Sequence, residues 1–450
     1  MINRKKYNFF HNRRTFFILF SILVVFIAFF NNEINIEIDT SNINSGDTAW
    51  MIIASAFVLL MTPGLAFFYG GMVNKKNIIS TMLQSFIALG IISVFWVFIG
   101  FSLSFGDSIY GLGIIGDPLQ YLNFKGVLSK NENIPFLLFA IFQLKFAVIT
   151  PALVSGSFAE RIRFRSYILF MVLFCLFIYC PLAHMTWASD GLFANFGDIL
   201  GWEGYQGLHV LDFAGGTVVH MSAGIAALCG AFFLGKRRKE FSDSENIKPA
   251  NIPFVILGTS LLWFGWFGFN AGSSLGANID AVIAFANTNI ASATSMITWV
   301  FYDRFLNRKI SAIGACIGAI VGLVAITPAA GFVTIGHSAF IGFTAAIISN
   351  IVMTSMKKSK IDDTLDVFAS HGIGGITGMI LTSVFANKVG LIYGNHETLI
   401  LHIIALIIVV LFVSIGSYLL YYIVNKILPL RVREDQEIKG LDLSQHGESL

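Results

Sequence analysis

The stretches DFAGGTVVHMSAG (residues 212–224) and DVFASHGIGGITG (366–378) each place a histidine among glycines within a long apolar segment. An ionisable side chain is costly inside a membrane span, and it usually marks a transport path or a paired structural site. His220 and His371 each have a glycine four residues further on, which shares their helix face and lets another backbone approach. Two readings follow: the two imidazoles face each other along a narrow path, or they are separate core histidines bonded to backbone carbonyls.

Composition places these histidines in a membrane. Of the 450 residues, 56% are hydrophobic and 12% are charged, against about 25% charged in a soluble domain. The mean hydropathy is +0.75, so lipid must cover much of the surface. The net charge of +3 is too small to indicate nucleic-acid binding. The four cysteines show no CxxC spacing, so we expect no metal site, and nothing indicates a cofactor.

Eleven apolar segments have roughly the length needed to cross a bilayer. They lie near residues 49–71, 78–105, 135–157, 166–188, 209–235, 251–272, 278–301, 311–327, 331–355, 364–387 and 397–425. The predicted fold is therefore an all-α polytopic membrane protein with a transmembrane domain over 49–425 and a tail over 426–450. Residues 1–31, basic and then apolar, are typical of a signal peptide, with an uncleaved anchor as the alternative.

Lys and Arg gather in alternate loops, after the first, third, fifth, seventh and ninth segments. Such loops face the cytoplasm, so we expect a cytoplasmic (inner) membrane protein with its mature N-terminus outside and its tail inside.

Eleven spans can form two five-helix repeats, about 49–235 and 251–387, and an extra helix at 397–425. A repeat with an odd number of spans must be inverted in the membrane. Similar strings, TPGLAFFYGG (62–71) and FGWFGFNAGS (264–273), open the two halves.

Asp212 and several aromatic residues accompany the histidines. An unpaired carboxylate would be costly there, so Asp212 either caps a helix start or biases the region toward cations. Asp366, which opens the second histidine stretch, is expected to be a cap as well. Aromatic residues near span ends, such as Trp187, are membrane-interface anchors or a vestibule that attracts a small cation to its ring faces.

Taken together, these strings resemble the ammonium transporter family, with looser similarity to Rhesus proteins. The matching strings are TPGLAFFYGG (62–71), FAERIRF (158–164), AHMTWA (183–188), LDFAGGTVVH (211–220), GWFGFNAGS (265–273), DVFASHGIGG (366–375) and GLDLSQHGES (440–449). The resemblance spans nearly the whole chain after residue 62. It implies eleven helices in two inverted halves, a pore through each subunit of a homotrimer, and a cytoplasmic PII-type regulatory protein as partner.

Roles for particular residues follow from the resemblance alone. Trp187 and Ser273, with Asp212 nearby, match an outer site that recruits ammonium. Phe146 and Phe269 match a stacked ring pair that closes the pore, with Phe146 shared by both sites. His220 and His371 match twin pore histidines. Lys145 departs from the pattern, because many relatives carry an uncharged residue beside the phenylalanine.

The implied function is movement of ammonium or methylammonium, as ammonia with or without a separate proton, for nitrogen uptake. A site that removes a proton distinguishes ammonium from potassium, which has no proton to lose. The alternatives are an ammonium-sensing receptor or another cation channel on the same fold, although no TVGYG-type filter is present. An enzyme is a weak alternative, because two histidines without a third ligand make a poor zinc site.

Overall fold

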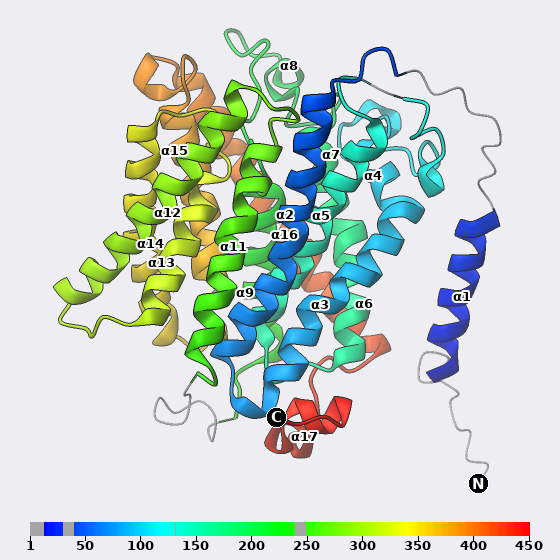
Figure 1. Cartoon of the computed structure of the whole chain (residues 1–450), viewed down its shortest axis with the longest axis vertical. Coiled ribbons are helices and arrows are strands. Elements are labelled where there is room, and N and C mark those ends of the chain that lie inside the picture. The colour runs from blue at the N-terminus through cyan, green and yellow to red at the C-terminus, as the bar shows by residue number, and fades with distance from the viewer. Residues whose placement is uncertain (1–12, 30–39, 131, 239–248) are drawn as a thin grey trace.

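The computed structural model describes residues 13–29, 40–130, 132–238 and 249–450, and these form a bundle of long helices (Figure 1). Of the predicted N-terminal segment 1–31, only α1 (Arg13–Phe29) falls within this description. The bundle has a tail face, where the C-terminal α17 (Glu434–Lys439) lies, and an opposite face, which carries α8 (Phe196–Leu200) (Figure 1).

The long helices follow the predicted apolar segments. The first half contains α2 (Ser45–Met72), α3 (Ile78–Phe95) with α4 (Phe101–Phe105), α5 (Phe136–Val154), α6 (Phe164–Phe174) with α7 (Cys180–Trp187), and α9 (Ser222–Leu234). The second half contains α11 (Ile252–Gly272), α12 (Ile279–Phe305), α13 (Ala312–Ile326), α14 (Ile335–Lys357) and α15 (Ile373–Phe385), and α16 (His396–Ile427) follows.

Nine of the described helical segments are long and apolar enough to cross a membrane. The 27-residue α12 and the 15-residue α13 fall outside that set and stand in the same bundle (Figure 1). The predicted all-helical membrane fold is confirmed, and the predicted count of eleven is consistent with these helices.

Two predicted spans begin later than expected. In the span predicted at 209–235, helix begins at Gly216, because Gly215 has a φ of 112° and breaks the helical path. In the span predicted at 364–387, the helical turn begins at Phe368, after Asp366 with a φ of 55°. In both spans, a hydrogen-bonded non-helical segment replaces the predicted first turn or two.

The tail is tied back to the start of α3. The Asp442 carboxylate accepts hydrogen bonds from the backbone N–H groups of Ile79 (3.1 Å) and Ser80 (2.7 Å). It therefore supplies the helix cap that α3 lacks locally. The Asn77 side chain in turn accepts a hydrogen bond from the Leu441 N–H, at 2.8 Å.

The packing of α2 against α11 holds the two halves together. In Figure 1, α2 runs from the opposite face toward the tail face and α11 runs the other way, as inverted halves require. A Cβ added at Gly258 of α11 would lie 2.3 Å from the Phe68 nitrogen and 2.6 Å from the Gly64 oxygen. Glycine is therefore needed at this crossing, where two backbones meet.

We expect Gly258→Ala to destabilise the protein by about 1–3 kcal/mol or more, because an extra methyl group would push the two backbones apart. Thermal unfolding in detergent measures the loss. Gly90→Ala in α3 is the matched control, since nothing lies within 4 Å of its Cβ position. Equal melting temperatures for the two variants would contradict this account of the crossing.

Candidate functional site

The two histidines meet in the middle of the bundle. His220 lies on a π-helical turn, Gly216–Met221, that leads into α9, and His371 lies on the turn Phe368–Gly372 that leads into α15. Their Nδ1 atoms are 3.3 Å apart and their rings are tilted by 31°. Both side chains are almost completely buried. The structure therefore brings together the two residues that the sequence singled out.

A close approach between two backbones sets this distance. A Cβ added at Gly224 would lie 2.1 Å from the Gly372 nitrogen, well inside contact distance. Because Gly224, four residues after His220, has no side chain, the backbone at Gly372 can pack directly against the backbone of α9. This is the use of glycine that the sequence predicted.

Hydrogen bonds around Thr327 assign the proton positions on the two rings. The Thr327 hydroxyl accepts from Trp266 Nε1 (2.9 Å) and donates its only hydrogen to the Leu323 oxygen (2.8 Å). His220 Nε2, which lies 3.3 Å from the same hydroxyl oxygen, must therefore carry a hydrogen and donate it. Its Nδ1 is then an acceptor, and His371 Nδ1 is the donor between the rings.

His371 Nε2 consequently has a free lone pair. No hydrogen bond among the described residues uses this atom, and His371 lines a small cavity of about 10 Å³. That volume holds about one water-sized molecule. Sequence reasoning missed Thr327, because a threonine at the end of an apolar segment carries no distinctive signal.

A chain of aromatic rings leads from the histidines toward the opposite face. The Phe269 ring lies 5.8 Å from His220, and the Phe146 ring lies 4.3 Å from Phe269. Trp187 continues the chain, 5.9 Å from Phe146. Phe146 and Phe269 are buried, whereas Trp187 is half-buried and lines a cavity of about 270 Å³ at the opposite face.

Ser273 and Asp212 flank the ring chain. The half-buried Ser273 hydroxyl donates to the Phe269 oxygen at 2.9 Å, and Trp187 Nε1 donates to the backbone oxygen of Asp212 at 3.1 Å. The Asp212 carboxylate accepts from the N–H groups of Gly215, Gly216 and Thr217 and from the Thr217 hydroxyl, at 2.5–2.8 Å. This geometry gives Asp212 the helix-capping role, one of the two readings of its sequence position.

A second cavity continues the path toward the tail face. It measures about 410 Å³ and is lined by Met72 of α2 and Ile317 of α13. Phe68 and Ile320, about one turn away on the same two helices, line the cavity at the histidines. The two cavities therefore follow one another along α2 and α13.

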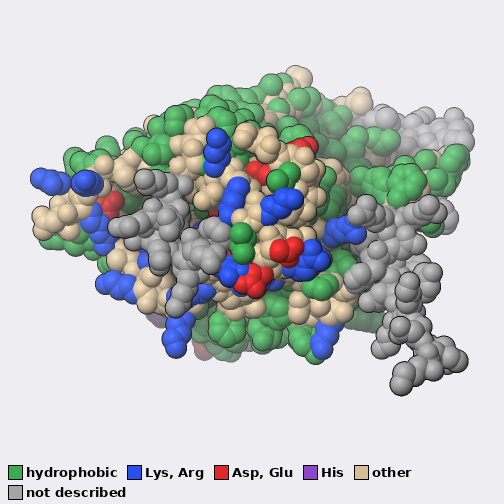
Figure 2. Space-filling view, turned by 90° about the horizontal axis from the view of Figure 1, so that it is seen from below, with side chains coloured by type: hydrophobic (Ala, Val, Ile, Leu, Met, Phe, Trp, Pro, Cys, Tyr) green, Lys and Arg blue, Asp and Glu red, His purple; other side chains and the backbone are tan. Residues whose placement is uncertain are grey.

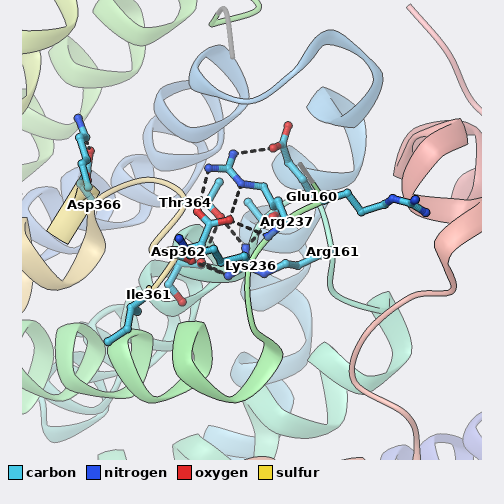
Figure 3. A network of polar contacts seen from close by, with 12 residues as sticks. Glu160, Arg161, Lys236, Arg237, Ile361, Asp362, Thr364 and Asp366 are labelled. Carbon is cyan, nitrogen blue, oxygen red and sulfur yellow. Dashed lines mark hydrogen bonds and ion pairs between the residues drawn. The ribbon is translucent and has the colours of Figure 1, made fainter. Parts of the chain in front are cut away.

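Charged side chains hold the tail-face end of this path (Figure 3). Arg237 forms ion pairs with Glu160 (2.8 Å) and Asp362 (2.9 Å). Arg161, fully buried, donates to the Asp362 backbone oxygen and the Thr364 hydroxyl, both at 2.6 Å. Burial lowers the pKa of Arg161 to about 10, which leaves it charged at neutral pH. The network thereby fixes the loop that precedes the His371 helix.

Asp363, not Asp366, caps the turn that carries His371. Its carboxylate accepts from the Phe368 N–H at 2.7 Å, whereas Asp366 forms an ion pair with Lys357 at 3.5 Å. The expectation that Asp366 is the cap was wrong, because its left-handed backbone places it outside the first turn. Loss of hydration and the nearby Asp366 carboxylate raise the pKa of Asp363 to about 7.

A membrane-crossing bundle around a narrow path of rings and two bonded imidazoles defines a membrane transport protein. Among the described residues, no group of three or more His, Cys, Asp or Glu side chains could hold a metal ion. A family model described as the Ammonium Transporter Family matches residues 49–450. The chain belongs to the ammonium transporter family.

Relatives and solved structures agree with this assignment. The ammonium transporter of Aquifex aeolicus is 43% identical over 417 residues, which cover 91% of this chain and 94% of the relative. The ammonium transporter of Bacillus subtilis is 43% identical over 415 residues, covering 90% and 98%. The crystal structure of Candida albicans Mep2 aligns with a TM-score of 0.81 at 33% identity, covering 91% and 90%. A solved structure named Sensor Amt Protein aligns with a TM-score of 0.80 at 28% identity, covering 89% and 98%.

Replacing Asp212 tests its capping role. Asp212→Ala leaves three buried N–H groups without an acceptor, at about 1–3 kcal/mol each. We expect a clear fall in melting temperature in detergent. Asp198→Ala, which removes one exposed hydrogen bond to Gly207, should change it little. A wild-type melting temperature in Asp212→Ala would refute this role.

The raised pKa of Asp363 predicts how stability depends on pH. In the unfolded chain this carboxyl ionises near 3.8, whereas in the folded protein it stays protonated up to about 7. The folded state then binds more protons between these values, so stability should fall as pH rises from about 4 to about 7. Thermal unfolding across this range should show a weaker fall in Asp363→Asn. Parallel curves for the two proteins would contradict the assignment.

Proposed function

We propose that this chain transports ammonium by admitting the cation at the opposite face and passing neutral ammonia along the cavity beside the bonded histidines. The observation that carries the proposal is the continuous series of Trp187, the ring pair Phe146 and Phe269, and the bonded imidazoles of His220 and His371. In this series Trp187 recruits the cation, the ring pair excludes its water shell, and the imidazoles guide the neutral molecule.

Trp187 and Ser273 are proposed to recruit the cation. The ring face of a tryptophan attracts a small cation, and Trp187 lines the open cavity at the opposite face. The Ser273 oxygen, which already donates to a backbone carbonyl, keeps lone pairs for an ammonium N–H. Asp212 contributes mainly by holding the chain beside Trp187, since its carboxylate is occupied by backbone donors.

Phe146 and Phe269 are proposed to close the path to hydrated ions. Their rings are 4.3 Å apart, so a molecule passes only when they move aside and only without its water shell. Removing the water shell from a cation costs several kcal/mol even in a favourable protein site. Neutral ammonia loses only a few hydrogen bonds. This difference favours deprotonation before passage, with the released proton either left to water at the opposite face or passed separately along the histidines. Potassium has no proton to lose and therefore has no equivalent route.

The imidazole pair is proposed to guide ammonia. The free lone pair of His371 Nε2 accepts an N–H of the passing molecule in a cavity otherwise lined by apolar and aromatic side chains. A proton travelling along the same pair would reverse both ring tautomers and break the bond from His220 to Thr327. Before a second proton could pass, both rings would have to return to their original tautomers.

The tail face is proposed to be cytoplasmic, in the inner membrane. Figure 2 views this face and shows Lys and Arg side chains spread across it, as positively charged inner loops would be. A homotrimer is proposed because the resemblance implies one. For a PII-type regulatory partner, the support is the resemblance together with the tail docked beside the basic start of α3.

Replacing the histidines tests the transport path. We expect His220→Ala and His371→Ala to lower uptake of labelled methylammonium by on the order of tenfold, because the polar guide is lost. The wider space should also admit water and potassium current. Uptake and bi-ionic current in proteoliposomes measure both effects. The exposed His396→Ala, at the start of α16, is the control.

Unchanged uptake, current and selectivity in both variants would overturn the path. Ammonium binding to the wild-type protein without any uptake would instead favour the receptor alternative, which the likeness to the Sensor Amt structure keeps open.

A further inference from the structure

Two polar side chains reach the outer surface of the bundle near the middle of long apolar helices. Lys145 is half-buried and stands at the midpoint of α5. Asn289 is exposed on α12, within the central third of that helix. Their neighbours one turn earlier are apolar, the half-buried Ile141 on α5 and the exposed Phe285 on α12. Neither residue takes part in the transport path described above.

Both side chains lack a polar partner among the described residues. Lys145 and Asn289 form no hydrogen bond or ion pair with any residue that the structure describes. A lysine at the centre of a membrane helix is costly to insert, and it usually pairs with another polar group. α5 has 19 residues and is about 28 Å long, so its midpoint lies about 14 Å from either end. That depth is too great for a lysine to bring its charge to the interface while its stem lies along α5.

The two residues lie at the same depth, because one carboxylate aligns the chains that lead to them. Asp47 accepts hydrogen bonds from the Asn133 side chain and from the Ala277 N–H (2.7 Å). Asn133 precedes Lys145 by twelve residues, and Ala277 precedes Asn289 by twelve. Both segments become helical within three residues of the Asp47 contact, so they descend by nearly equal distances.

The two residues also lie on different sides of the molecule. α5 packs against α2 and α3, whereas α12 packs against α11 and α13. In Figure 1 the α2–α11 pair stands between α12 on one side and α3 on the other. Subunits arranged in a ring about an axis normal to the membrane keep every residue at its own depth. Such a ring joins two different surfaces of the chain at each contact.

We propose that Lys145 of one subunit donates a hydrogen bond to the side-chain oxygen of Asn289 in a second copy of this chain, at the middle of the membrane. The contact rests on the homotrimer proposed above and names the two surfaces that meet in it, α5 beside α3 and α12. It satisfies the lysine and the asparagine together. A hydrogen bond from a charged donor in a dry interface is about twice as strong as a neutral one.

Cross-linking tests which surfaces meet. In the double variant Lys145→Cys with Asn289→Cys, a bifunctional thiol reagent about as long as a Lys–Asn contact should yield linked dimers and trimers on a denaturing gel. Each single variant should stay monomeric on that gel, since the native cysteines are buried or half-buried. Lys145→Cys with Val282→Cys is the depth control, because Val282 lies about 10 Å away along the exposed face of α12.

A mutant cycle tests the bond itself. Asn289→Leu leaves the lysine unpaired and should raise the trimer dissociation constant by on the order of tenfold or more, and Lys145→Met should raise it less. Lys145→Met combined with Asn289→Leu should recover most of the loss, because no polar group is then stranded. Native mass spectrometry in mild detergent measures all four proteins.

Two results would overturn the contact and leave the homotrimer proposal unaffected. The first is a loss of trimer stability in Lys145→Met with Asn289→Leu equal to the sum of the two single losses. The second is a trimer that Lys145→Cys with Asn289→Cys does not cross-link. A wild-type protein that stays monomeric in native mass spectrometry would overturn both. Methylammonium uptake by the same samples reports on the transport proposal separately.

Discussion

The contact between His220 Nδ1 and His371 Nδ1, 3.3 Å long, is the interaction on which the rest of the site depends. It exists because two helices approach at Gly224 and Gly372 more closely than any side chain would allow. Each histidine comes from the last helix of its half of the chain, so the contact also joins the two halves. A side chain at Gly224 would separate the rings and break the hydrogen bond that determines which nitrogen of each ring carries the proton.

The positions of the two ring protons matter because few other polar groups line the cavity beside the histidines. Thr327 fixes the outer nitrogen of His220 as a donor, and the bond between the rings then leaves His371 Nε2 as an acceptor. One acceptor in an apolar cavity suits a small neutral molecule that carries N–H groups. A single acceptor replaces very little of the hydration that a cation would lose on entering this cavity. In the proposed function, the close-packed rings from Trp187 to Phe269 require a cation to lose its water shell before it reaches the histidines.

Much of this arrangement could be predicted from the sequence. The glycines beside the two histidines left open whether the rings face each other, and the family resemblance favoured the facing pair. The apolar segments gave helices in the right order. The non-helical residues before Gly216 and Phe368 were less accessible, since their conformation depends on which backbone N–H groups the Asp212 and Asp363 carboxylates reach. Asp363 and Asp366 look alike in sequence, and only the left-handed backbone at Asp366 separates the cap from the ion pair. Thr327 gains its importance from two distant neighbours, Trp266 and His220, which composition and spacing do not report.

The most direct test of the account is the protonation of the two rings. Solid-state ¹⁵N NMR of histidine-labelled protein in lipid bilayers, with His220→Ala and His371→Ala to assign the signals, distinguishes the tautomers. At neutral pH the account predicts two different neutral rings, with the proton on Nε2 of His220 and on Nδ1 of His371. Two rings of the same tautomer, or a charged imidazolium at either position, would contradict it.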